Sequence, residues 1–224
     1  MLENSVKTSS VVEIRVKCGL CGRVWDSNAS YVQQEGWCGY CTRFKYQIIC
    51  RWYFEQIFSY SLHTTIEFPE TRLEGLIKSY VKSSYTKEEL EVVMNLIKHG
   101  SFDGYTEIIL NNRLVRIAFE YDGTYHTKFH SLYHKSIADF LYTKLKDRLK
   151  NSLARENNII LIRIPYNAID YKMKDYKLIQ KSIIAEISEY FDLPYVPQFN
   201  HNNTDFIQYF KQQAIEKKIT DWLD

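Results

Sequence analysis

Long apolar runs, a secretory signal and a strong net charge are all missing from this chain of 224 residues. No apolar run is long enough to span a bilayer, and the segment Met1–Ser10 is polar. We therefore expect a protein of the cytoplasm or nucleus that is neither secreted nor bound to a membrane. The formal net charge is only +2, so a nucleic-acid-binding role would have to depend on local basic patches.

Glycine and proline are scarce, with eight and four residues, whereas apolar residues make up 45% of the chain and tyrosine occurs 18 times. This composition is typical of a folded globular protein without a long disordered tract. Internal repeats and low-complexity segments are also absent. A chain of this length holds one core of ordinary size plus an appendage.

Four of the five cysteines form two CxxC pairs, Cys18 with Cys21 and Cys38 with Cys41. Two such pairs bring four thiolates together as a tetrahedral site for a structural Zn²⁺, with no coordination position left open for catalysis. Two disulfides or a redox CxxC are the alternatives, but neither a secretory signal nor a βαβ pattern accompanies the pairs. Cys50 is left over in an apolar helical run, where we expect a buried thiol.

Residues 101–126 predict a β-hairpin. Asn111-Asn112 is the only turn signal between two stretches rich in β-branched and aromatic residues. Folding about this turn places residues whose numbers sum to 223 opposite each other, so that Glu107 pairs with Arg116, an opposite-charge pair. Side chains alternate along a strand, which gives this strand two distinct faces. The expected core face carries Val115, Ile117, Phe119 and Tyr121, and the other face carries Arg116, Ala118, Glu120 and Asp122.

Three carboxylates gather at one end of this hairpin. The register places Asp103 opposite Glu120, and Asp122 lies on the same face as Glu120. Like charges that face each other destabilise a sheet, and a divalent cation such as Mg²⁺ or Mn²⁺ would offset them. A solvated acidic strand end without a metal is the alternative interpretation.

The remaining pattern predicts a mixed α/β fold. Helical periodicity and capping signals predict helices over residues 45–60, 72–82, 86–98, 136–156, 176–190 and 203–223. Residues 11–17 predict a strand, and the apolar run 159–165 predicts a buried strand that is parallel to its neighbour after a helical crossover. We expect an N-terminal zinc module over 1–44, a core domain over 45–167 and a helical extension over 168–224 that packs on the core.

Basic residues cluster on the helix 136–156 and in the loop before it. The candidate nucleic-acid-binding residues are Lys128, Lys135, Lys144, Lys146 and Arg148. Cations beside clustered acids suit the cleavage of phosphodiesters, because the cations hold the phosphates. An ordinary solvated helix face is the alternative interpretation of the same residues.

These motifs together resemble a known family. CGLCGRVW and GWCGYC, then ICRWYFEQIF, FDGY, AFEYDGTYH, DRLK and NNIILIRIPY are similar to proteins that pair a zinc ribbon with a PD-(D/E)XK, restriction-endonuclease-like domain. Such proteins are common in phages, giant viruses and mobile elements and are related to the very-short-patch-repair nucleases. The resemblance covers roughly residues 11–167. It implies a central mixed sheet with helices on both sides.

The resemblance also implies roles for single residues. Asp103 matches the metal-binding aspartate of the family, Glu120 its second acid and His126 its histidine, while Asp147 and Lys150 match a D-x-x-K on the following helix. The chain departs from the family pattern at Asp122, which stands where the classical motif has a lysine. It also departs at Gln47, which stands where an acid of the first helix is common. Lys150 could supply the missing cation, Gln47 could ligate through its amide oxygen, and Glu55 could substitute for it.

The sequence thus predicts a Mg²⁺- or Mn²⁺-dependent endonuclease that hydrolyses phosphodiester bonds in DNA, with the zinc ribbon assisting DNA binding. DNA is the expected partner, and a homodimer is possible. Two alternatives stay open: a catalytically disarmed nucleic-acid-binding protein, and a zinc-ribbon interaction module that docks on replication or transcription machinery.

Overall fold

The computed structural model describes residues 13–17, 24–28, 39–129, 131, 134–166, 177–192, 196–199, 205, 208–209 and 212–213. The chain divides into two compact units, Met1–Ile48 with Asn202–Asp224, and Ile49–His201. The fold is mixed α/β, as the sequence predicts. In the described part of the chain, no helix has both the length and the apolar character needed to cross a membrane.

The first unit contains a short β-hairpin. Strands β1 (Glu13–Lys17) and β2 (Val24–Asn28) pair antiparallel, with Val16 opposite Trp25. The strand predicted over 11–17 is confirmed over residues 13–17. Cys18, Cys21 and Cys38 and the side chain of Cys41 lie outside the described residues, as does most of the helix predicted over 203–223.

Helix α2 spans Gly39–Leu62, so it begins earlier than the predicted residue 45 and contains the junction between the two units. From Ile49 on, its buried side chains include Tyr53, Phe54, Ile57 and Phe58. The apolar residues occur at nearly every position of this segment, and the helix is buried around more of its circumference than a surface helix would be.

Helix α6 (Ile137–Glu156) and strand β7 (Ile159–Pro165) confirm the elements predicted after the hairpin. Ser136 caps α6 at its start, since its side chain accepts a hydrogen bond from the backbone N–H of Asp139. Asn158, with a φ of 54°, turns the chain out of the helix. Helix α7 (Lys177–Ser188) likewise matches the helix predicted over 176–190.

The predicted hairpin is confirmed, and its register is the expected one. Strand β5 (Gly104–Leu110) pairs antiparallel with β6 (Arg113–Asp122), and every partner pair sums to 223, from Leu110 with Arg113 to Gly104 with Phe119. Asn111 and Asn112 have φ angles of 49° and 61°, as a type I′ turn requires. Strand β7 pairs parallel with β6 and completes a three-stranded mixed sheet in the order β5-β6-β7.

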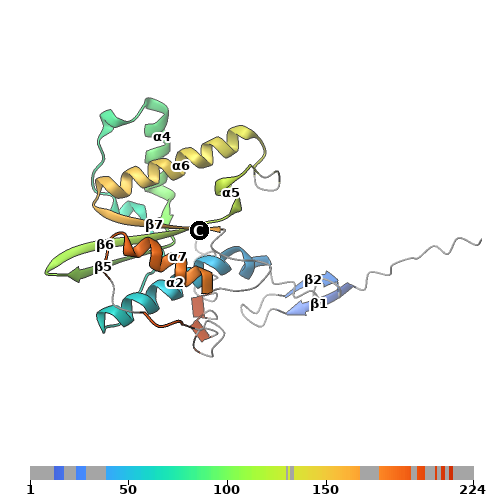
Figure 1. Cartoon of the computed structure of the whole chain (residues 1–224). Helices are drawn as coiled ribbons and strands as arrows, with labels where there is room; N and C mark the ends of the chain where they lie inside the picture. Colours follow the sequence, from blue (N-terminus) through green and yellow to red (C-terminus); the bar gives the residue numbers. More distant parts are fainter. Residues whose placement is uncertain are drawn as a thin grey trace, which may run out of the picture. The chain divides into compact units, whose positions relative to one another are not determined.

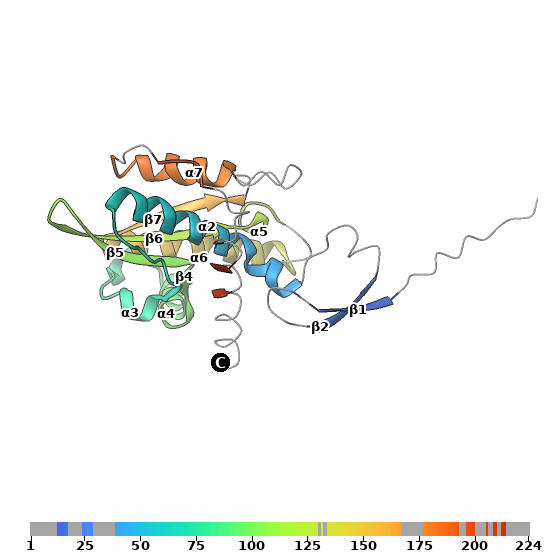
Figure 2. The same ribbon diagram turned by 90° about the horizontal axis from the view of Figure 1, so that it is seen from below.

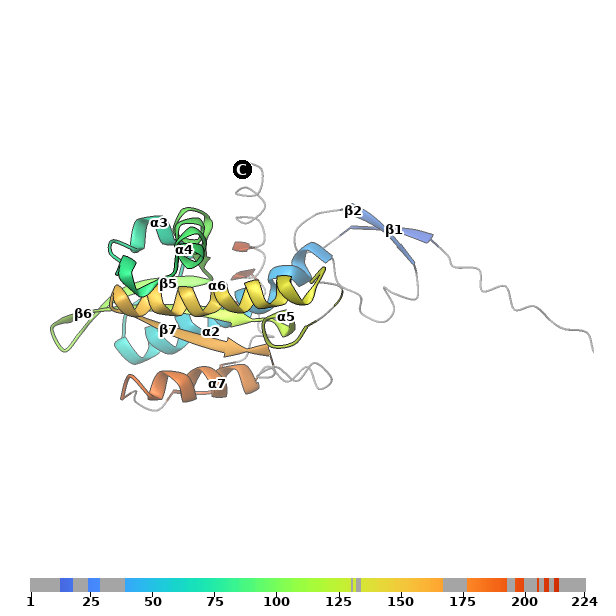
Figure 3. The same cartoon turned by 90° about the horizontal axis from the view of Figure 1, so that it is seen from above.

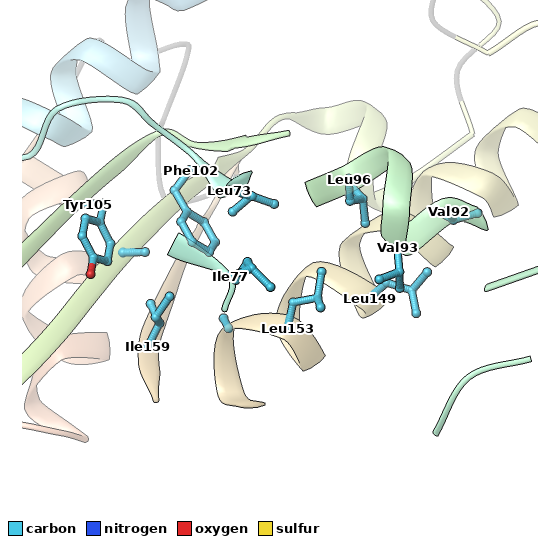
Figure 4. Close-up of a cluster of buried hydrophobic side chains, with 12 residues drawn as sticks. Leu73, Ile77, Val92, Val93, Leu96, Phe102, Tyr105, Leu149, Leu153 and Ile159 are labelled. Carbon is cyan, nitrogen blue, oxygen red and sulfur yellow. The ribbon is translucent and has the colours of Figure 1, made fainter. Parts of the chain in front are cut away.

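Both faces of this sheet are covered, which corrects the expectation of a single core face on β6. Phe119 stacks on Phe54 of α2 at 4.6 Å between ring centroids, whereas its neighbour Ala118 is buried in a cluster with Leu149 and Leu153 of α6. Figure 1 and Figure 2 show α6 on one side of the sheet, with α2 and α7 on the other. The twelve buried residues of the α6-side cluster include Leu73, Val93, Leu96 and Phe102 (Figure 4).

The helix predicted over 72–82 is wrong. This segment contains strand β3 (Thr71–Arg72), one turn of helix α3 (Leu73–Leu76) and a 3₁₀ turn, η1 (Lys82–Ser84). The side chain of Asn157 accepts hydrogen bonds from the backbone N–H groups of Lys78 and Ser79 and donates one to the carbonyl of Ser79. These bonds take the place of the backbone bonds of a continuous helix.

Helix α4 spans Lys87–His99 and agrees with the prediction over 86–98. Thr86 and Glu89 form a capping box at its start, in which each side chain bonds to the backbone N–H of the other residue. The short strand β4 (Ser101–Phe102) follows and pairs antiparallel with β3, so the chain is anchored directly before Asp103.

Candidate active site

Asp103 lies in a bend between β4 and β5, outside the ladder in which the sequence analysis had paired it with Glu120. Its Oδ2 accepts a hydrogen bond from the backbone N–H of Tyr121 at 2.8 Å, which brings its carboxylate to β6 beside Glu120. Its carbonyl oxygen accepts a hydrogen bond from the guanidinium of Arg51, a residue of α2 that is only 4% exposed. The two acids are therefore adjacent as expected, but through a bend and not through strand pairing.

Glu120 is buried on the α6 side of the sheet, with 7% of its surface exposed. Its Oε1 accepts a hydrogen bond from Nζ of Lys150 at 2.8 Å, and the same Nζ donates to the carbonyl of Ser101 at 2.8 Å. Burial and the negative charge of Asp103 raise the pKa of Glu120 to about 8, although Lys150 and Arg163 oppose the shift. The predicted cation from α6 thus reaches the second acid.

Asp122 has a partner that the sequence analysis did not foresee. Arg163 of β7 donates from Nε to Oδ2 of Asp122 at 2.9 Å and from Nη2 to Oδ1 at 2.7 Å, a bidentate pair. The third carboxylate of the hairpin is therefore bound by a guanidinium.

Asp147 of α6 and His126 of α5 (Thr124–Thr127) form a second pair beside Asp122. Nδ1 of His126 lies 2.8 Å from Oδ2 of Asp147, and Oδ1 of Asp147 accepts a hydrogen bond from Nη2 of Arg163 at 3.0 Å. Burial raises the pKa of Asp147, but its bonds to His126 and Arg163 outweigh this and hold the pKa below its ordinary value. Figure 3 shows α5 beside the N-terminal part of α6.

The predicted nucleic-acid-binding residues differ in their surroundings. Lys128, Lys135 and Lys144 are exposed. Nζ of Lys146 lies 5.1 Å from the centroid of the Tyr142 ring. Arg148 forms an ion pair with Glu89 of α4, yet its side chain is 65% exposed, so the pair contributes little to stability.

Predictions that involve the first unit remain predictions. The four zinc-ligand candidates lie outside the described side chains, and Gln47 belongs to the unit Met1–Ile48, whereas the acids belong to Ile49–His201. Oε1 of Glu55 accepts a hydrogen bond from the backbone N–H of Phe68 at 2.9 Å, and the role of Glu55 as a substitute ligand stays a prediction.

The sequence analysis did not predict two arginines of the site, Arg51 and Arg163. Each stands alone in an apolar run, ICRWYF and IILIRIP. Arginine is almost never buried without a partner, so an arginine inside a run that predicts a buried element is itself a signal for a nearby acceptor. In β7 the signal is sharper, because parallel pairing aligns Arg163 with Glu120.

Comparison with known proteins gives one partial match. Over 73 residues the chain is 33% identical to an uncharacterized protein, 307L, of Invertebrate iridescent virus 6. The matched segment is 33% of this chain and covers only 36% of that protein. No family model and no solved structure matches. The match identifies no family.

Proposed function

We propose that this protein is a Mg²⁺- or Mn²⁺-dependent endonuclease that hydrolyses phosphodiester bonds in DNA. The observation that carries the proposal is the group of Asp103, buried Glu120 and Lys150, in which two adjacent acids meet one lysine at the end of the β5-β6 ladder. Acids and a cation of this kind are what metal-assisted phosphodiester cleavage requires.

The donor set fits a divalent cation. Carboxylate oxygens are the ligands that Mg²⁺ and Mn²⁺ prefer. The pKa of Glu120 is raised to about 8 by burial and by the charge of Asp103, so a positive ion held between the two acids would relieve the repulsion. When bound, such an ion lowers the pKa of a coordinated water and offsets the negative charge that develops on the phosphate.

The residues of this chain would then divide the work. Asp103 and Glu120 would hold the ion, and the N–H of Tyr121 keeps the Asp103 carboxylate in place. Lys150, whose Nζ donates to Glu120, would neutralise the charge of a phosphate bound beside this acid. His126, fixed by Asp147, orients or deprotonates the attacking water.

The arrangement of the elements supports the proposal as well. The antiparallel β5-β6 hairpin, the crossover helix α6 and the parallel strand β7, with helices on both faces of the sheet, agree with a restriction-endonuclease-like core. DNA would be held by the exposed Lys128, Lys135 and Lys144 together with Lys146, assisted by a zinc ribbon at Cys18, Cys21, Cys38 and Cys41.

The test is incubation of the purified full chain with supercoiled plasmid in the presence of Mg²⁺, Mn²⁺ or EDTA. We expect nicking or linearisation that requires the metal and is abolished by Asp103→Ala and by Glu120→Gln. Glu91→Gln, on the exposed side of α4, is the matched control and should cleave like wild type. Turnover by Glu120→Gln at the wild-type rate would refute the assignment of that residue.

A nucleic-acid-binding protein without cleavage activity is the second candidate function. The observation in its favour is that Asp122 is bound by Arg163, which leaves two of the three expected acids for a metal. In the same plasmid assay, this candidate predicts a gel shift without cleavage under any metal condition.

A further inference from the structure

Asp122, His126 and Asp147 form a second group of potential metal ligands, adjacent to Asp103 and Glu120 along β6. One ligand atom from each of the three residues lies within 4.8 Å of the other two. Two carboxylates and an imidazole at this spacing are a ligand set that first-row divalent metals accept. The geometry therefore raises the question of whether the protein binds a second divalent cation.

The guanidinium of Arg163 already lies among these ligands and bonds to both carboxylates. It makes four hydrogen bonds: two to Asp122, one to Asp147 and one, from Nη1, to Oδ1 of Asn151. A planar fork with fixed donors matches the two carboxylates in a way that a point charge does not. The side chains of Arg163, Asp122 and Asp147 are 17 to 20% exposed, so the cluster is largely shielded from solvent.

We propose that Arg163 is the resident cation of the Asp122–His126–Asp147 cluster: it keeps a second divalent cation out and fixes the Asp147 carboxylate against His126. Arg163 is a positioning residue, since it acts on His126 through Asp147. The part that concerns His126 rests on the proposed nuclease function. The part that concerns the cation does not, because it follows from the ligand geometry alone.

The connectivity explains why one residue can do both. Nη2 of Arg163 donates to Asp122 and to Asp147 at once, so a single atom links β6 to α6. The other carboxylate oxygen of Asp147 is left for Nδ1 of His126. Loss of the guanidinium would leave two negative charges facing each other with a histidine beside them, which is the charge pattern of an open metal site.

The cation part is tested by equilibrium dialysis with Mn²⁺, in a full-length chain whose proposed catalytic pair is removed by Asp103→Asn and Glu120→Gln. In this background, adding Arg163→Met should increase the Mn²⁺ bound by one ion per chain, and adding His126→Ala should reverse the gain. Arg113→Met, at the exposed hairpin turn, is the matched control and should add no Mn²⁺. Arg163→Gln repeats the test with a neutral side chain that can still donate to Asp122, in case the methionine variant does not fold.

Two outcomes would overturn the cation part. One is that folded Arg163→Met and folded Arg163→Gln bind no more Mn²⁺ than the background chain. The other is that the background chain, with Arg163 in place, already binds a Mn²⁺ that His126→Ala removes. Because the catalytic pair is absent throughout, a wild-type protein that fails to cleave DNA would not affect either result.

The positioning part is tested by cleavage rates in Mg²⁺ in the otherwise wild-type chain. Arg163→Met should reduce the rate at least tenfold, and Arg163→Lys should restore part of it without binding a second Mn²⁺, because the lysine keeps the charge. Equal rates for the lysine and methionine variants, both folded by circular dichroism, would show that the charge at position 163 does not position His126.

Discussion

Burial of Glu120 next to Asp103 should make the stability of the metal-free protein depend on pH in a way that one substitution removes. The pKa of Glu120 is raised from 4.5 to about 8, first by burial and then by the charge of Asp103. A raised folded-state pKa means that the protonated acid favours folding. Its contribution is therefore fully present below the unfolded pKa of about 4.5 and is lost as the pH rises through about 8.

The magnitude follows from the shift. Each pKa unit corresponds to about 1.4 kcal/mol, so wild type should lose at most about 3 kcal/mol between about pH 5 and about pH 7.5 through this group. For a protein of this size, that corresponds to a fall in Tm of roughly 6 to 12 °C. Glu120→Gln carries no charge at this position and should lack this part of the pH dependence.

The assay is urea denaturation of wild type and Glu120→Gln in EDTA at both pH values. Other groups titrate in the same interval, so the relevant quantity is the difference between the two proteins, with Glu91→Gln as an exposed control that should follow wild type. Mg²⁺ should stabilise wild type at the higher pH and leave Glu120→Gln unchanged. If the two free energies of unfolding change in parallel with pH, the reasoning about burial and charge at Glu120 is refuted.

Three further predictions concern the scaffold, each measured as a change in the free energy of unfolding by urea denaturation. Gly104→Ala should cost about 3 kcal/mol, because an added Cβ would lie 2.1 Å from Cε1 of Phe119; wild-type stability would show that the ring moves freely. Asn157→Ala should cost about 3 kcal/mol through its lost bonds to the backbone near Ser79, and Asn157→Asp, which keeps the acceptor, should cost less. Thr86→Ala should cost about 1 kcal/mol by removing the capping box of α4, whereas Thr86→Ser should be close to neutral.

Local signals were sufficient for the elements that lead into the site. The turn at Asn111-Asn112 determined the register of the hairpin, because both residues tolerate a positive φ and no other turn signal competes nearby. The limits of α6 could also be predicted, since Ser136 caps the helix and Asn158 ends it directly before β7. Lys150 of α6 therefore reaches Glu120, in agreement with the expectation that it could supply the cation missing from the hairpin.

Features that depend on distant residues could not be predicted in this way. Residues 72–82 have helical periodicity, but the backbone groups of Lys78 and Ser79 bond to Asn157, which is almost 80 positions away in the chain. The guanidinium of Arg163 is 41 positions from Asp122. In both cases the hydrogen-bond partner is a side chain from a distant part of the chain. Periodicity is evaluated within a short window of sequence, and no such window contains both partners.

Gly104 lies between the aromatic core and the acid pair, since it faces Phe119 in the last pair of the ladder and directly follows Asp103. Without a Cβ at this position, the ring of Phe119 can cover the backbone and stack on Phe54 on the α2 side. The ladder ends at the pair of Gly104 and Phe119. The preceding residue, Asp103, lies in a bend outside the strand, and its carboxylate accepts a hydrogen bond from the N–H of Tyr121. The sequence FDG thus links the aromatic core to the acid pair. A substitution at Gly104 should damage stability and the site together, whereas Asp103→Ala should impair the site and leave the core intact.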